Sequence, residues 1–529
     1  MSVFDQMRMY WRFAWGLRGF LREPITLEQS RQIIKQRLKD REKNLLTIVR
    51  RGIYENRSSP YLKLLELVGC EYGDFEKMVQ SDGIEPTLQK LAREGVYVSI
   101  EEFKGMKELT RGGKAFKFKE SDFDNPFLSG HLESSSGATR SAGTRTIYDF
   151  DYLTANWTVY GITMLDAYGA FGVPFALWLP IMPGAGPAVV LSFTKAGKIP
   201  VRWFSPVDKR GFKPSLKNRM GTNYIVYAGR LLGAKLPRPE YVSVDDAWRV
   251  AQWMAEAITQ QGGCCFSTYP SLAVRICQTA RERGIDLAGA KFFPSGEPTT
   301  EAKRKEIESS GACIYPAYVF MEAGAIGHGC VNPVVADEVH FFKDKLALIQ
   351  QLREVPHAAV SVDAFLFTTL LPSAPKILLN AESGDYGVVE TRSCGCKFEQ
   401  LGFTDHIYNI RGFDKLTSEG MTFIGTDLVR IIEEVLPARF GGVSTDYQMV
   451  EEEDEQGHTR MSIIASPELG AIDEAELVKT VLAELSKGKD TGRMMAEVWA
   501  QAKTLRVQRR RPFATARGKL MLLHIYKHR

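Results

Sequence analysis

Residues 291–327, KFFPSGEPTTEAKRKEIESSGACIYPAYVFMEAGAIG, contain the pattern that decides the fold. They predict a strand, a turn, a helix around residues 300–311 and a second strand, with Glu322 directly after that strand. Strands that alternate with helices are typical of α/β proteins, and ligands bind such sheets at the turns that follow strand ends. We therefore expect an α/β fold in which Glu322 is either a ligand for a divalent cation or a solvated turn residue.

The same alternation continues toward the N-terminus of this stretch. Residues 151–172 predict a helix, and a second helix is expected after Ser243, with Asp246 in a capping-box-like start. Residues 169–193 form a long uncharged run that contains four prolines. Because a membrane-spanning helix rarely tolerates so many prolines, we expect two short buried strands joined by a turn there.

The two ends of the chain have different patterns. Residues 1–125 predict a mostly helical region of the large domain, with Thr26 capping an amphipathic stretch over 27–57. The C-terminal part predicts a compact α+β unit with helices at 426–437 and 474–488 and strands at 447–450 and 461–465, joined by an acidic hairpin loop at 451–455. The expected parts are a helical region (1–125), a core that binds ATP and carboxylate (126–410) and a smaller, mobile C-terminal α+β domain (411–529).

Composition excludes several classes of protein. The 529 residues are 44% hydrophobic and 25% charged, which is typical of a globular protein with several domains. The net charge of only +5 argues against nucleic acid as the main partner, although residues 501–529 hold nine Lys or Arg and no acid. Eight sparse cysteines favour a reducing compartment, and the N-terminal 20 residues interrupt their apolar side chains with arginines, unlike a signal peptide. We expect a cytoplasmic protein without a transmembrane segment.

A loop rich in hydroxyl side chains and glycine lies at residues 134–145. Small residues allow backbone N–H groups to approach phosphate oxygens, and Arg140 and Arg145 would neutralise their charge. The loop is not a Walker P-loop, because no Gly-Lys-Ser/Thr follows at the required spacing. Taken alone, this composition is more typical of a flexible linker than of a phosphate-binding loop. Its candidate phosphate-binding residues are Ser134, Ser135, Ser136, Gly137 and Thr139.

Six motifs in order carry a resemblance to a known family. They are the loop at 134–145, SGEP at 295–298, YVFME at 318–322, SGD at 383–385, IRGFDKLTSEGM at 410–421 and ATARGKL at 514–520. Together they resemble the signature series of adenylate-forming (acyl-activating) enzymes, in particular the phenylacetate-coenzyme A ligase branch and the related acyl-protein synthetases. The similarity covers about residues 125–529.

The resemblance implies a role for each matching position. The loop at 134–145 would hold the β- and γ-phosphates of ATP, and Glu322 would hold Mg²⁺. Lys519 would bridge the α-phosphate and the substrate carboxylate, while Arg411 would contact ribose or phosphate at the domain junction, with a hinge at Asp414 or Lys415. The remaining nucleotide contacts would come from Gly296, Glu297 and Pro298 along the adenine, Tyr318 on its face, and Asp385, in a tight turn, on the ribose hydroxyls.

Four residues form a candidate structural zinc site. Cys394 and Cys396 offer two thiolates on one turn, and Cys330 and His340 lie upstream, with His328 as a spare histidine. Three thiolates and one imidazole suit tetrahedral zinc and leave no open position for catalysis. Relatives in the phenylacetate ligase branch carry a similar arrangement. The alternative is a set of unconnected buried cysteines and an ordinary histidine.

Some residues depart from the family pattern. Ala138 and Arg140 replace the usual Thr or Gly in the loop, Val319 and Ile410 replace glycines, and Met321 replaces the Thr before the metal-binding Glu. A thioether in place of a hydroxyl removes a phosphate contact. These departures keep open reduced turnover or a substituted function.

Two further surfaces are expected. A pocket for an aromatic or acyl carboxylate should lie beside the helix at 149–168 and the segment 262–271, with Cys264, Cys265, Phe266 and Tyr269 as wall residues. The N-terminal stretch places Tyr10, Phe13, Leu17 and Leu21 at helical spacing, which favours a docking helix over interfacial membrane binding.

The functional expectation is an enzyme of the acid-thiol ligase type. It would use ATP and Mg²⁺ to convert a small-molecule carboxylate into an acyl-adenylate, and then form an acyl thioester, with coenzyme A as the default acceptor. Transfer to a carrier protein or protein thiol, and a non-catalytic scaffold on a degenerate ligase fold, are the alternatives. Nucleic acid is not an expected partner.

Overall fold

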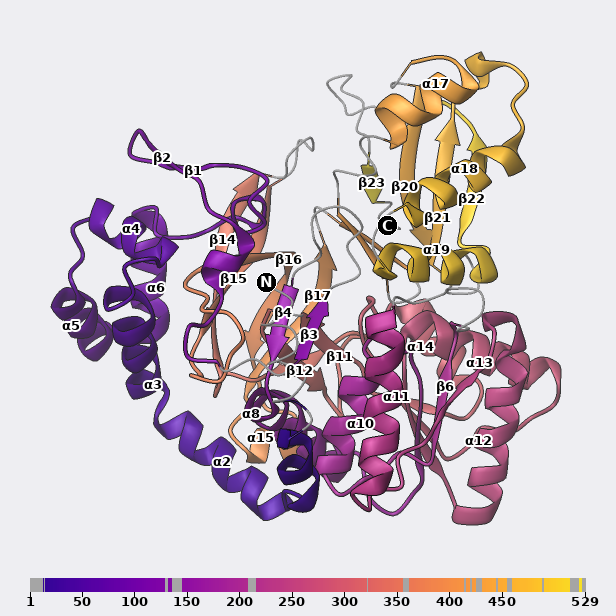
Figure 1. Ribbon diagram of the computed structural model, residues 1–529, viewed down its shortest axis with the longest axis horizontal. Coiled ribbons are helices and arrows are strands. Elements are labelled where there is room, and N and C mark those ends of the chain that lie inside the picture. The colour runs from indigo at the N-terminus through magenta and orange to yellow at the C-terminus, as the bar shows by residue number, and fades with distance from the viewer. Residues whose placement is uncertain are drawn as a thin grey trace.

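The computed structural model describes most of the chain (Figure 1). The described residues are 13, 15–128, 132–135, 145–207, 216–320, 322–354, 361–412, 415–418, 421–424, 431–443, 446–453, 459–487, 490–513 and 523–525.

The N-terminal region is mostly helical, as predicted. Thr26 caps the first long helix, because its side chain accepts a hydrogen bond from the Gln29 backbone while the Gln29 side chain accepts from the Thr26 N–H. The amphipathic stretch predicted over 27–57 is divided into three consecutive segments rather than one helix. The elements are α2 (Leu27–Lys39), α3 (Arg41–Ile48), a π-helical segment (Val49–Tyr54), α4 (Pro60–Leu67), α5 (Tyr72–Asp82), α6 (Ile84–Arg93) and α7 (Ile100–Phe103).

A six-stranded parallel sheet confirms the α/β prediction. Its strand order is β10-β9-β8-β5-β6-β7, and helices connect successive strands. The strands are β5 (Phe175–Trp178), β6 (Arg202–Ser205), β7 (Pro239–Tyr241), β8 (Cys264–Thr268), β9 (Ala290–Pro294) and β10 (Cys313–Ile314). The helices of this region are α8 (Phe150–Leu153), α9 (Val159–Ala167), α10 (Gly186–Lys195), α11 (Leu216–Leu231), α12 (Ala247–Gln261), α13 (Pro270–Glu282) and α14 (Glu301–Glu308).

One element of this region was predicted wrongly. The uncharged run at 169–193 contains a single strand, β5, and its second half is the helix α10, not a strand. Pro187 lies in the first turn of α10, where a proline has no hydrogen bond to lose. No helix among the described ranges is both long and apolar enough to cross a bilayer.

A seven-stranded antiparallel sheet lies beside the parallel one. Its order is β11-β12-β13-β17-β16-β15-β14, and it shares a hydrophobic core with the N-terminal helices. The strands are β11 (Ala317–Phe320), β12 (Gly324–Gly329), β13 (Val339–Phe341), β14 (Leu346–Glu354), β15 (Ser361–Thr369), β16 (Ala381–Thr391) and β17 (Asp405–Gly412). This sheet carries Tyr318, Asp385 and Arg411.

The C-terminal region forms a four-stranded sheet with the helices α17, α18 and α19, at the top right of Figure 1. Its elements confirm the predicted strands and the helix expected at 474–488. They are α17 (Leu436–Phe440), β20 (Tyr447–Glu453), β21 (Thr459–Ala465), α18 (Glu474–Ser486), α19 (Asp490–Ala502), β22 (Leu505–Arg509) and β23 (Leu523–Ile525). Of the helix predicted at 426–437, the described part is a π-helical segment over Ile431–Val435 that leads into α17.

The acidic run at 451–455 begins in a strand, which corrects its assignment as a loop. Residues 451–453 pair with β21, and Glu452 forms ion pairs with Arg506 and Arg510 at 3.0 and 2.9 Å. Part of the basic C-terminal stretch is therefore neutralised within its own sheet. The domain boundaries at 125 and 410 stay predictions.

Candidate functional site

The SGEP turn follows β9 and lies directly beside β11. Ser295 forms a parallel bridge with Ala317, the residue before Tyr318. Gly296 is exposed and has a φ of +87°, a conformation that a residue with a side chain rarely adopts. The backbone of this turn therefore lies next to the first residue of β11, the strand that carries Tyr318, at the end of a parallel strand, where α/β sheets bind ligands.

Tyr318 and Asp385 form a hydrogen-bonded pair from two strands of the antiparallel sheet. The Tyr318 hydroxyl donates to Oδ2 of Asp385 at 2.8 Å, and the Asp385 side chain is buried. Burial and the adjacent carboxylate raise the pKa of Tyr318 well above its ordinary value, so the hydroxyl remains a donor. Asp385 lies within β16, which corrects the expectation of a tight turn; Gly384 has a φ of +78° inside this irregular strand.

Glu322 follows β11 and faces a lysine. Its Oε1 lies 3.2 Å from Nζ of Lys104, and both side chains are nearly buried. Glu120 lies close by and pairs with Lys376 at 3.3 Å. The carboxylate that was predicted to hold Mg²⁺ is therefore charge-balanced by the chain itself.

Arg411, in β17, is likewise paired. It donates to Oδ2 of Asp337 at 2.8 Å, and Asp337 also accepts from the backbone N–H groups of Asn409 and Ile410. These three hydrogen bonds hold this end of β17 in place. Arg411 pairs there with Tyr386 of β16, the residue after Asp385.

Glu297 differs from the other residues of its turn. Its carboxylate is buried, accepts a hydrogen bond from the Ser271 hydroxyl and lies 3.4 Å from Nζ of Lys303. At residues 296–298 the turn therefore offers a ligand mainly its backbone and the half-buried Pro298.

The expected substrate wall is only partly accessible. Cys264, Cys265 and Phe266 are fully buried in β8, inside the parallel sheet, which corrects their assignment to a pocket wall. Burial raises the pKa of both thiols to about 12, so they are unreactive core residues. Tyr269, at the start of α13, remains a candidate wall residue.

Several predicted residues lie outside the described part of the chain. They are Ser136, Gly137, Ala138, Thr139, Arg140, Met321, Asp414 and Lys519. Around the loop, the structure describes the backbone of a hairpin in which Ser134 pairs with Thr146 and Ser135 with Arg145. The meeting of Lys519 with this loop stays a prediction.

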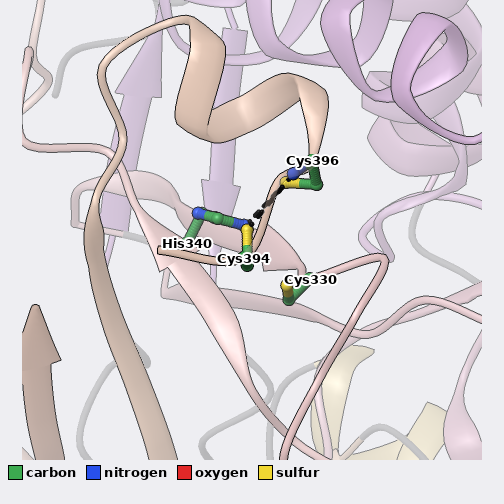
Figure 2. A group of neighbouring side chains, drawn as sticks. All are labelled: Cys330, His340, Cys394 and Cys396. Atoms are coloured by element: carbon green, nitrogen blue, oxygen red, sulfur yellow. Dashed lines mark hydrogen bonds between the residues drawn. The ribbon is translucent and has the colours of Figure 1, made fainter. Parts of the chain in front are cut away.

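The structure brings the four predicted zinc ligands together (Figure 2). Cys330 follows β12, His340 lies in β13, and Cys394 and Cys396 precede the short helix α15 (Lys397–Gln400). Their donor atoms all lie within 4.8 Å of one another, with Nε2 of His340 at 3.0 Å from Sγ of Cys396 and 3.6 Å from Sγ of Cys394. His328 is not part of this group; its ring packs against Phe342 and Phe398.

Hydrogen bonds orient these donors. Nδ1 of His340 lies 2.7 Å from the Phe403 carbonyl oxygen, so Nδ1 carries the proton and Nε2 presents its lone pair to the cysteines. The Glu399 carboxylate accepts from the N–H groups of Cys394 and Gly395, which fixes the Cys-Gly-Cys turn. A hydrogen bond from the Cys330 thiol lowers the pKa of Cys396 well below its ordinary value, so one thiolate is already favoured. Three cysteines and an oriented imidazole are the donor chemistry that structural zinc requires.

Comparisons with known proteins identify the fold. No protein-family model matches the chain, and no curated protein matches it by sequence. A solved structure of 2-hydroxyisobutyryl-CoA ligase, in complex with 2-HIB-AMP and CoA, aligns with 92% of this chain and 89% of its own at a TM-score of 0.52 and 14% identity. The chain has the fold of the adenylate-forming enzymes.

Weaker alignments are also found. An amide bond synthetase from Marinactinospora thermotolerans has 11% identity and a TM-score of 0.39, with 82% of this chain and 76% of that chain covered. An o-succinylbenzoate CoA synthetase from Bacillus subtilis has 11% identity and a TM-score of 0.38, with 74% of this chain and 67% of that chain covered.

The sequence did not predict a network of buried polar and charged side chains that lies beside the cysteines. Nδ1 of His406 lies 2.5 Å from Oε1 of Glu338, and Arg392 bonds the same carboxylate and approaches Sγ of Cys330 at 3.6 Å. Burial opposes ionisation of Glu338, but hydrogen bonds from His406, the Val334 N–H and Arg392 lower its pKa to about 2. Glu338, His406 and Cys330 also form a second group with metal-ligand spacing. No spacing in the sequence indicates it, because His406 reaches this place through the pairing of β17 with β13.

Proposed function

We propose that the chain is an ATP-dependent ligase that activates a carboxylate as an acyl-adenylate and then forms an acyl thioester. The observation that carries the proposal is the convergence of the SGEP turn, the Tyr318–Asp385 pair and Arg411 around the ends of two sheets, in a chain with the adenylate-forming fold.

In the first step, a carboxylate oxygen of the substrate attacks the α-phosphorus of ATP, and the bond to pyrophosphate breaks. Both reactants are anions, so catalysis depends on positioning and on positive charge rather than on a nucleophilic side chain. Lys519 supplies that charge at the α-phosphate, and Arg411 supplies it beside the ribose. Asp385, held by Tyr318, accepts hydrogen bonds from the ribose hydroxyls.

Glu322 is the proposed residue for Mg²⁺, which would neutralise the phosphate oxygens. Because Glu322 pairs with Lys104, cation binding must loosen that ion pair. In the second step a thiol sulfur attacks the acyl carbon, the bond to the AMP oxygen breaks, and the thiol proton leaves to solvent. Coenzyme A is the proposed acceptor, and a carrier-protein or protein thiol is the alternative. The cysteine site is proposed to bind zinc as a structural brace, since four protein donors leave no open position.

Exchange of labelled pyrophosphate into ATP tests the proposal. With Mg²⁺ and a panel of aromatic and aliphatic acids, we expect exchange that depends on one acid class and falls by a factor of about 10² or more in Lys519→Ala. Lys527→Ala, which removes another lysine of the same C-terminal stretch, should retain exchange. Coenzyme A and carrier-protein thiols are then compared by mass spectrometry of the thioester.

A non-catalytic scaffold is the second candidate. It is favoured by Ala138, Val319 and Met321 at motif positions and by the ion pairs that occupy Glu322 and Arg411. A scaffold would show no exchange with any acid while still binding a non-hydrolysable adenylate analogue or ATP. Exchange with any acid, abolished by Lys519→Ala, contradicts the scaffold.

A further inference from the structure

Helix α11 exposes a stripe of large apolar side chains. Met220, Tyr224, Tyr227 and Leu231 follow one another at intervals of four, three and four residues, so they lie along one face of the helix. Their exposed fractions are 61, 39, 54 and 92%. Contiguous exposed apolar side chains of this size indicate an interaction surface.

The N-terminal helix at residues 15–22 extends this surface. The end of this helix near Phe13 packs on α11, because the ring centroids of Phe13 and Tyr224 lie 6.0 Å apart. Phe13 and Leu17 are buried, so the apolar face expected to form a docking helix packs within the chain instead. The outward face carries Trp15, which is 76% exposed, together with the exposed Arg18 and Arg22.

The sequence of these segments is mostly basic, with Glu23 as an exposed acid directly after Arg22. Residues 209–239 contain eight Lys or Arg and no Asp or Glu. Residues 6–22 contain four arginines and no acid. Among them, Arg18, Arg22, Arg230, Lys235 and Arg238 are exposed in the structure, and the Arg238 guanidinium lies 5.2 Å from the centroid of the Tyr227 ring.

We propose that the outward faces of α11 and residues 15–22 form a docking surface for an anionic lipid bilayer. Tryptophan and tyrosine prefer the boundary between headgroups and acyl chains, and Lys and Arg beside them attract anionic headgroups. A second copy of this chain is the less suitable occupant, because two identical basic faces repel each other. The protein would lie on the surface of the bilayer, with these side chains at the headgroup boundary.

Sedimentation with lipid vesicles tests this surface. We expect the full-length protein to bind vesicles of phosphatidylcholine with one quarter phosphatidylglycerol, and to bind pure phosphatidylcholine at least tenfold more weakly, at roughly 0.1 M salt. Removing two charges in Arg18→Ala/Lys235→Ala should weaken binding to the anionic vesicles by about 25-fold, since each basic residue near the surface contributes about fivefold.

Apolar insertion is tested separately. Tyr227→Ser/Leu231→Ser should weaken vesicle binding by at least about tenfold, because two exposed side chains no longer enter the headgroup boundary. The matched control is Leu352→Ser/Val443→Ser, which removes two apolar side chains of 70 and 60% exposure elsewhere. All four altered positions are exposed, so thermal unfolding should be unchanged.

Three results overturn the proposal. They are no binding of the parent protein to anionic vesicles at low salt, equal binding by the stripe variant and its control, and a dimer in light scattering that Tyr227→Ser/Leu231→Ser converts to a monomer without any vesicle binding. The last result would make the stripe an interface between two copies.

Discussion

The cysteine site and the proposed nucleotide site, which consists of Tyr318, Glu322, Asp385 and Arg411, belong to one sheet but differ in how their side chains are held. At the cysteine site, backbone groups and Glu399 hold the donor atoms in position, and the donors face one another. At the other site, Glu322 and Arg411 are held by opposite charges within the chain, Lys104 and Asp337. The difference suggests a permanent brace in the first case and, in the second, charged groups that a ligand must draw away from their partners.

Loss of one cysteine ligand should have the largest effect on stability, and it tests whether the cysteine site is a permanent brace. Cys396→Ser should lose the bound metal and lower the free energy of unfolding by about 4 kcal/mol or more, because three donors remain around an incomplete site. Elemental analysis and thermal unfolding measure both effects, and a strong chelator should reproduce the loss of stability in the parent protein.

Cys265→Ser is the control, since Cys265 is equally buried but lies in β8. It should be destabilised without losing metal. A parent protein that purifies with no tightly bound metal and takes up no zinc would contradict the brace.

The next largest effect is a pH dependence of stability that arises from Asp344, a buried carboxyl at the turn between β13 and β14. Burial raises the pKa of Asp344 to about 6, against the opposing effects of Arg37, Tyr160 and Lys345. Above about pH 4 the unfolded chain releases this proton, whereas the folded state keeps it until about pH 6. The contribution of Asp344 to the free energy of unfolding is therefore fully present below about pH 4 and is lost as pH rises through about 6. The total change is about 3 kcal/mol at most.

Asp344→Asn stays neutral and should remove this fall in stability between pH 4 and 6. Urea unfolding across that range measures it. Asp363→Asn, at an exposed position of β15, should leave the pH profile of the parent protein unchanged. An identical slope in both variants would contradict the assignment.

At the proposed nucleotide site, Glu322→Gln should reduce pyrophosphate exchange by about 100-fold and raise the Mg²⁺ concentration required, because the proposed cation ligand is lost. Glu120→Gln is the matched control, as this neighbouring carboxylate is also mostly buried and paired with a lysine. Equal losses in both variants would show that the ion pairs, not cation binding, support the reaction.

The sequence predicted the elements whose signals are local. The capped helix after Thr26 and the strands β20 and β21 follow from periodicity and capping residues, as do β9, α14 and β11, the strand that ends just before Glu322. The prediction of two strands at 169–193 was wrong, because its prolines were interpreted as interrupting any helix, although Pro187 lies in the first turn of α10.

The site residues depended on more than local signals. Cys330, His340, Cys394 and Cys396 were selected through a family resemblance, and the structure brings them together. Glu338, Arg392 and His406 could not be selected in this way, because their contacts depend on the pairing of β13 with β17. Asp385 was assigned to a turn because Ser-Gly-Asp is typical of turns, whereas the positive φ of Gly384 occurs within a strand.

The smallest expected effect concerns the hydrogen bond between Tyr318 and Asp385. Tyr318→Phe removes the donor that orients the carboxylate proposed to bind ribose, so the KM for ATP in the exchange reaction should rise by about tenfold while kcat changes little, as for a contact made equally in the ground and transition states. Tyr315→Phe is the control, because Tyr315 is close in sequence but stacks on Tyr168, 3.9 Å between ring centroids. It should leave KM unchanged. If Tyr318→Phe instead lowers kcat at an unchanged KM, the pair acts on the reacting groups, and the assignment of Asp385 to the ribose is wrong.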